Sequence, residues 1–84
     1  MDPNQATIAV LHTTTATLKL IADLIHERAP EARVIDYLDS SILPDINVAE
    51  RITYKLEQRI VGLMRQADLA DPDILMTASP RLVI

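Results

Sequence analysis

At 84 residues the chain forms one domain at most, and a domain of this size buries only about 60% of its unfolded surface. The formal net charge of -4, with no basic cluster to offset it, argues against nucleic acid as a partner. Cysteine is absent, which excludes disulfides, thiolate metal sites and thiol catalysis by this chain. No apolar run approaches the ~20 residues of a membrane span and no cationic leader precedes the first strand, so we expect a soluble, cytoplasmic protein.

The first part of the chain is predicted to form a strand, a helix and a second strand. Thr7–Leu11 is a short apolar, β-branched run, typical of a strand covered on both faces. A helix follows, capped by a threonine at position 13, 14 or 15 and ended by Pro30. Its apolar stripe consists of Leu18, Ile21, Ala22, Ile25 and Ala29. Arg33–Tyr37 is predicted to be the second strand.

The second part is predicted to form a loop, a long helix and a third strand. The loop covers Asp36–Asn47, and the helix covers Val48–Ala70. The buried stripe of that helix consists of Ala49, Ile52, Leu56, Ile60, Leu63 and Ala67. A charged row at intervals of four, typical of a solvated face pairing with Glu50 or Glu57, consists of Arg51, Lys55 and Arg59. The last strand covers Asp73–Thr77.

The βαβαβ order predicts an α/β fold in which residues 1–84 make a single lobe. Alternating strands and helices favour a parallel sheet with right-handed crossovers. If the second and third strands lie on either side of the first, the helices cover both faces and the chain forms half of a doubly wound, flavodoxin-like sheet with strand order 2-1-3. In such sheets a ligand lies beyond the carboxyl ends of the strands, where the winding reverses. Here that place lies between the first and third strands, at the loops His12–Thr15 and Thr77–Ser79.

Three segments resemble the Asp/Glu racemase superfamily, which includes arylmalonate decarboxylase-like proteins. Ile8–Thr13 is similar to the first strand and His-Thr turn of that family, and Leu38–Leu43 to its Asp-x-Ser-Leu loop. Asp73–Ser79 is similar to the strand that carries a Thr-Cys-Ser turn, with Ala78 at the position of the cysteine. The order and spacing of the three segments match the amino-terminal lobe.

The resemblance implies a cofactor-independent protein acting at a carbon next to a carboxylate. In this family two similar lobes flank the active site and each contributes one cysteine. Residues 1–84 correspond to one lobe and have Ala78 in place of its thiol, so we expect carboxylate-binding loops without catalysis by the isolated chain. The residues expected to bind a small carboxylate or another anion are His12, Thr13, Thr14, Thr77 and Ser79.

The polar residues also have plainer interpretations. His12 is either a substitute acid/base or a histidine with local hydrogen bonds, and His26 is interpreted as a solvated surface residue. The Thr13–Thr17 run could cradle a phosphate or a flavin, or simply cap a helix, and the only glycine is Gly62, far from the run. Asp36, Asp39 and Asp45 could form a metal or phosphoacceptor site, but they are better interpreted as turn residues.

A self-association module of the same fold is the main alternative function. A three-stranded sheet has two open edges, and the terminal Leu82–Ile84 is apolar. We therefore expect a homodimer through the third strand, the chain end or the second helix, or else a separate second lobe. A naturally short chain, a truncated one and a Cys-to-Ala variant all remain open at this point.

Overall fold

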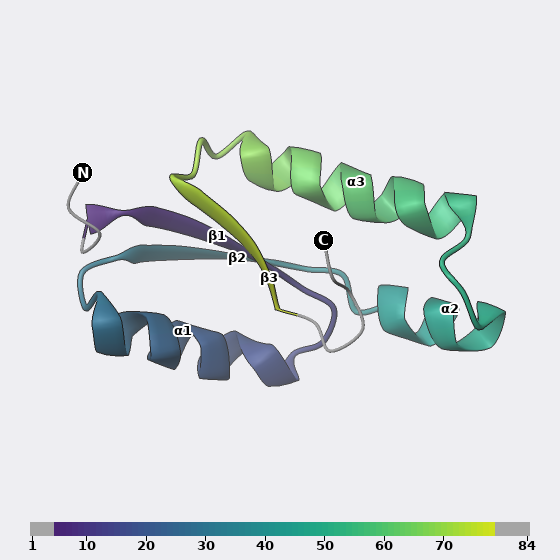
Figure 1. Cartoon of the computed structure of the whole chain (residues 1–84), viewed down its shortest axis with the longest axis horizontal. Coiled ribbons are helices and arrows are strands. Elements are labelled where there is room, and N and C mark those ends of the chain that lie inside the picture. Colours follow the sequence, from purple (N-terminus) through teal and green to yellow (C-terminus); the bar gives the residue numbers. More distant parts are fainter. Residues whose placement is uncertain (1–4, 79–84) are drawn as a thin grey trace.

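A computed structural model describes residues 5–78, and Figure 1 shows the sheet lying between helices. The strands are β1 (Thr7–His12), β2 (Arg33–Leu38) and β3 (Ile74–Ala78). The helices are α1 (Ala16–Arg28), α2 (Ile42–Ala49) and α3 (Tyr54–Asp68). The sheet is parallel with order β2-β1-β3, so the predicted fold class is confirmed.

β1 is the central strand, and its alternating side chains contact a different helix on each face. Ile8 and Val10 pack with Ile21 and Ile25 of α1. Ala9 and Leu11 pack on the other face, against a cluster that includes Ala67 of α3. Both faces of β1 are therefore covered, which explains why the strand has a continuous apolar run.

The predicted loop Asp36–Asn47 is wrong, because β2 continues to Leu38 and residues 42–49 form α2. Pro44 does not prevent this helix, since it lies in the first turn, where a backbone N–H has no helical partner to lose. Ile42 and Ile46 of α2 are buried against Leu56 and Ile60 of α3. A second apolar cluster therefore joins these two helices beyond the end of β2 (Figure 1).

The predicted helix Val48–Ala70 is also wrong in its first part, because the chain turns between α2 and α3. Glu50 has a left-handed backbone (φ 59°) and ends α2. Thr53 is extended, and its Oγ1 accepts the Leu56 backbone N–H at 3.3 Å, so α3 starts at Tyr54. Ile52, predicted to be buried in the helix, is 49% exposed in this turn.

Candidate functional site

The carboxyl ends of the three strands meet at one edge of the sheet. His12, the last residue of β1, lies in register with Leu38 of β2 on one side and with Ala78 of β3 on the other. The first turn of α1 begins four residues after His12. This edge is where the winding direction of the sheet reverses, so it is the place where a ligand site is expected in this fold.

His12 is fully buried, and both of its ring nitrogens are hydrogen bonded. Nδ1 lies 2.7 Å from Oγ1 of Thr17 in the first turn of α1, and Nε2 lies 2.6 Å from Oδ1 of Asp36 on β2. The Thr17 hydroxyl also lies 3.3 Å from the Thr14 carbonyl oxygen and 3.2 Å from that of Ala78. We call His12, Thr17 and Asp36 the His12 network. It connects α1 with all three strands.

Two arrangements of protons satisfy this geometry. In the first, a neutral ring donates Nε2–H to Asp36 and its Nδ1 accepts the Thr17 O–H. In the second, a doubly protonated ring donates from both nitrogens, and the Thr17 hydroxyl then donates to the carbonyl of Thr14 or Ala78. The proton on His12 therefore determines whether Thr17 donates to the ring or to a neighbouring carbonyl.

The threonines after His12 form the turn into α1. Thr13 is 4% exposed, and Thr14 is half-buried with its Oγ1 accepting the Ala16 backbone N–H at 2.9 Å. Thr15 occupies the N-cap position without a capping bond from its own side chain. The helix-capping interpretation of the threonine run is thus confirmed for Thr14. That bond uses a lone pair of the hydroxyl oxygen and leaves its hydrogen available to a ligand.

The predicted site residues do not all lie on one face. His12 and Ala78 are register partners, and Thr13 and Thr14 follow His12 directly. Thr77 is the register partner of Leu11, which packs toward α3, so its side chain lies on the opposite face from that of His12. Ser79 lies outside the described residues.

Asp36 and Thr17 were not predicted as site residues. Asp36 was interpreted as a turn residue, but it lies on β2 with its side chain toward His12. The sequence contained one usable signal: alternation places Asp36 on the same face as the apolar Val34, the face that packs on α1. Thr17 was noted only as part of the Thr13–Thr17 run, and nothing in the sequence indicated that it bonds His12.

A second polar cluster joins α3 to α2 and to the loop before it. Nη1 of Arg59 lies 2.6 Å from Oδ2 of Asp45, and Nη2 reaches Asp39 at 3.5 Å and also contacts Ser41. The pKa of Asp39 is lowered, mainly by the hydroxyl of Ser41, with further contributions from the Ser41 N–H and from Arg59. The hydrogen bond to Asp45 is the main reason why the pKa of Arg59 is raised. We call these residues the Arg59 cluster.

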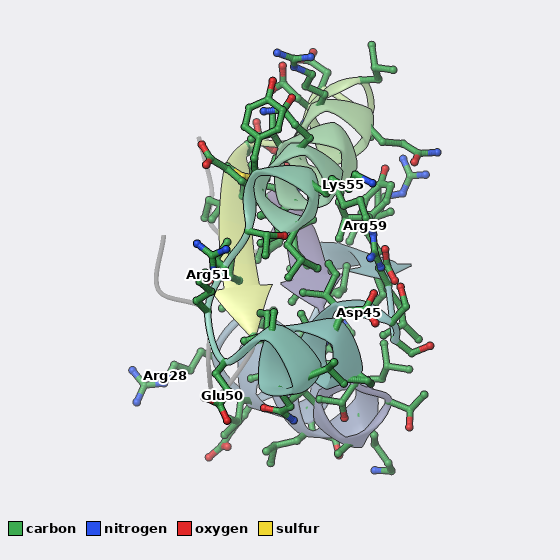
Figure 2. The ribbon with its side chains drawn as sticks, turned by 90° about the vertical axis from the view of Figure 1, so that its right-hand side faces the viewer. Arg28, Asp45, Glu50, Arg51, Lys55 and Arg59 are labelled. Atoms are coloured by element: carbon green, nitrogen blue, oxygen red, sulfur yellow. The ribbon has the colours of Figure 1, made fainter. Side chains whose placement is uncertain are left out.

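The Arg59 cluster corrects two predictions. Figure 2 shows Arg59 on the same side as Asp45 and Arg51 on the other side of the molecule, so the predicted row of Arg51, Lys55 and Arg59 does not exist as one face. Asp45 pairs with Arg59 instead of serving a turn, whereas Asp39 accepts the Ser41 backbone N–H at 2.9 Å, as a turn residue does. His26 is exposed, as predicted, and one ring nitrogen lies 3.0 Å from the Ala32 carbonyl oxygen.

The described residues contain no cluster of three or more His, Asp or Glu side chains arranged to hold a metal ion. Within residues 5–78 no helix has both the length and the apolar character needed to cross a bilayer. Comparison of the chain with protein-family models, with curated proteins and with solved structures gives no match. The fold and the site together define a small parallel α/β protein with a buried histidine, hydrogen bonded to Asp36 and Thr17, at the carboxyl edge of its sheet.

Proposed function

We propose that this chain is a carboxylate-binding lobe of the Asp/Glu racemase type and that it does not transfer the α-proton itself. The observation that carries the proposal is the position of Ala78, beside His12 at the edge where the winding reverses. In the family that the sequence resembles, the corresponding residue is a catalytic cysteine. A methyl group at this position can neither accept nor donate a proton.

Binding is supported by the turn that follows β1. The Thr14 hydroxyl is half-buried beside the first turn of α1, where the helix dipole favours an anion. The His12 network fixes this turn relative to Ala78, because Thr17 contacts the ring and both neighbouring carbonyls. The hydroxyl and the helix terminus are thus held in place before a carboxylate arrives, which lowers the cost of binding.

Lack of proton transfer is supported by the environment of His12. A general base must come within hydrogen-bond reach of the carbon-bound proton of its substrate. The His12 side chain has no exposed surface, and both of its nitrogens already have partners. In this arrangement His12 positions the turn and does not touch a ligand.

Mapping of backbone amide shifts during a titration with succinate tests the binding site. We expect the largest shifts at Thr13, Thr14 and Ala78, which surround the carboxyl edge. Shifts confined to the surfaces of α2 and α3, or no shifts at all, would contradict the proposal. A parallel titration with inorganic phosphate distinguishes a carboxylate site from a phosphate-binding loop. Shifts at the same amides with phosphate, and none with succinate, would favour the phosphate-binding loop instead.

A pair of threonine variants provides a matched control. Thr14→Val removes a hydroxyl at the start of α1, and Thr53→Val removes the capping hydroxyl at the start of a different helix, α3. We expect Thr14→Val to weaken succinate binding roughly tenfold, equivalent to about 1.4 kcal/mol, and Thr53→Val to leave it unchanged, because the Thr53 hydroxyl bonds α3 and not the turn after β1. Equal affinities for the two variants would show that the α1 turn is not the site.

A further inference from the structure

The outer edge of β3 is open within the part of the chain that the structure describes. β3 pairs with β1 on one side, and no other strand among residues 5–78 pairs with it. Ile74–Ala78 contains no proline and no charged residue. Such residues usually protect an edge strand from pairing with another chain. The backbone groups of this edge can therefore accept a further strand.

An apolar groove of about 460 Å³ lies beside β3 on the α1 face. Leu24 and Ile25 of α1 line one side of the groove, and Ile74 and Met76 of β3 line the other. Leu24 is 51% exposed and Ile74 is 49% exposed. None of the residues of α1 is fully buried, so its apolar stripe is only half covered by this sheet.

A second apolar groove, of about 290 Å³, lies beside β3 on the α3 face. Its lining is Val61, Met64, Arg65 and Asp68 of α3 together with Leu75 of β3. The four α3 residues are three and four positions apart, so they form one stripe that faces the β3 edge. The edge therefore has uncovered apolar side chains on both faces of the sheet.

The size and shape of the molecule agree with an uncovered flank. Its accessible surface is 5656 Å², about 700 Å² more than a compact 9.3 kDa monomer exposes, which is close to one partner's share of a standard interface. Its radius of gyration is 13.5 Å, whereas about 12 Å is expected for 84 residues. The excess area, taken over the whole chain, is thus close to what one copy contributes to a standard interface.

We propose that the β3 edge and its two grooves bind a second copy of this chain, with the two β3 strands antiparallel about a two-fold axis perpendicular to the sheet. A two-fold axis perpendicular to the sheet leaves the α1 faces of both copies on one side and the α3 faces on the other. The groove on the α1 face of one copy therefore lies beside the same groove of the second copy, and the same holds for the α3 face. Pairing centred on Met76 places the large Ile74 beside the small Ala78 of the partner copy, and Leu75 beside Thr77. The edge is therefore complementary to itself in side-chain size.

Distance and charge also favour a second copy. The two β1 strands would lie three strand spacings apart, about 14 Å, and long side chains from helices above them can meet across that gap. The groove on the α3 face has one positive and one negative side chain, Arg65 and Asp68, so two antiparallel copies of α3 present opposite charges to each other. This gives opposite charges at the rim of an apolar interface.

The mass in solution, measured by sedimentation equilibrium, tests this proposal. We expect the protein to have twice the 9.3 kDa mass of one chain at micromolar concentration. Ile74→Lys and Leu75→Lys each place a charge at the edge and should weaken the dimer roughly tenfold or more. Val48→Lys makes the same change at an 86% exposed position on α2, away from β3, and should leave the dimer intact.

A charge exchange on α3 tests the same arrangement without changing the edge strand. Arg65→Asp and Asp68→Arg should each weaken the dimer, and the double variant should restore it because the pair is reformed in the opposite sense. Circular dichroism verifies that each variant is folded. A monomeric wild type, a dimer unaffected by both lysine variants, or a double variant as weak as the single ones would overturn the proposal.

Discussion

At the scale of single residues, the His12 network is the most constrained feature of the molecule. A buried imidazole with two polar partners loses little by leaving water, whereas the same ring without one partner keeps the full desolvation penalty. The described residues contain no buried side-chain nitrogen or oxygen atom without a hydrogen-bond partner. Stability should therefore depend on the partners of His12 more than on exposed ion pairs.

Asp36→Ala tests this dependence. We expect the free energy of unfolding to fall by about 1–3 kcal/mol, because Nε2 of a buried ring loses its acceptor. Asp23→Ala is the control, since it removes a carboxylate from the exposed Lys19–Asp23 pair on α1 and should cost about 0.5 kcal/mol or less. Urea unfolding followed by circular dichroism measures both. Equal losses would mean that the network adds no stability beyond that of a surface ion pair.

The hydrogen-bond partners of His12 could be predicted from the sequence only in part. Of the two interpretations of His12, the one with local hydrogen bonds matches its contact with Thr17, whereas the contact with Asp36 on β2 was not predicted. His12 and Asp36 are 24 residues apart in the chain. They meet because the register sets Asp36 opposite Val10, which lies two residues before His12 and on the same face of the sheet. A pattern within one strand does not determine the register between two strands.

At the scale of elements, α2 and the turn that follows it were not predicted from the sequence pattern. Pro44 favoured a loop, yet Ile42 and Ile46 are four positions apart and could have predicted a helix that packs on Leu56. The turn at Glu50 could not be predicted in this way, because a left-handed glutamate has no sequence signal comparable to glycine. Packing against α3 favours α2 over a continuous helix.

Acid unfolding should reveal the contribution of the Arg59 cluster. The folded protein lowers the pKa of Asp39, so the unfolded chain binds a proton more readily at that residue. The resulting stability is present above the ordinary pKa of about 4 and is lost as the pH falls through the lower folded value. We therefore expect unfolding in urea to become easier between about pH 5 and pH 2.

Ser41→Ala isolates this effect, since the Ser41 hydroxyl is the main cause of the lowered pKa of Asp39. The variant should lose less stability than the wild type over the same pH range. Ser40→Ala makes the same chemical change one residue earlier, at an exposed position, and should keep the wild-type pH dependence. If the Ser41 and Ser40 variants behave alike, the hydroxyl of Ser41 does not hold Asp39 in its charged form.

At the scale of the whole molecule, topology was predictable and the uncovered surface was not. Alternating strands and helices predicted a parallel sheet with right-handed crossovers, and placing the second and third strands on either side of the first gave the order β2-β1-β3 that the structure has. The two grooves beside β3 depend on how far α1 and α3 extend over the sheet, which is determined by packing. The predicted site at the carboxyl edge was also correct only in part. The topology places His12 beside Ala78 as expected, whereas the Thr77 side chain lies on the other face of the sheet.

The same geometry leads to a prediction about catalysis. Racemisation needs an acid and a base on opposite sides of the same carbon. At the two positions where β1 and β3 meet at the carboxyl edge, the chain has His12, which is buried and bonded to Asp36, and Ala78, which cannot exchange a proton. We expect the wild type to show no exchange of the α-proton of aspartate, glutamate or an arylmalonate in deuterated water above the uncatalysed rate, as measured by proton NMR.

Ala78→Cys extends this prediction. The substitution restores a thiol on one side of the predicted carboxylate site, so it should not invert the substrate, because the other side still lacks a proton donor. Chiral chromatography after prolonged incubation measures inversion, and titration of the free thiol verifies that the new side chain is reduced and accessible. Exchange by the wild type that disappears in His12→Asn, with the fold verified by circular dichroism, would show that the imidazole reaches the substrate after all and acts where the family uses a thiol.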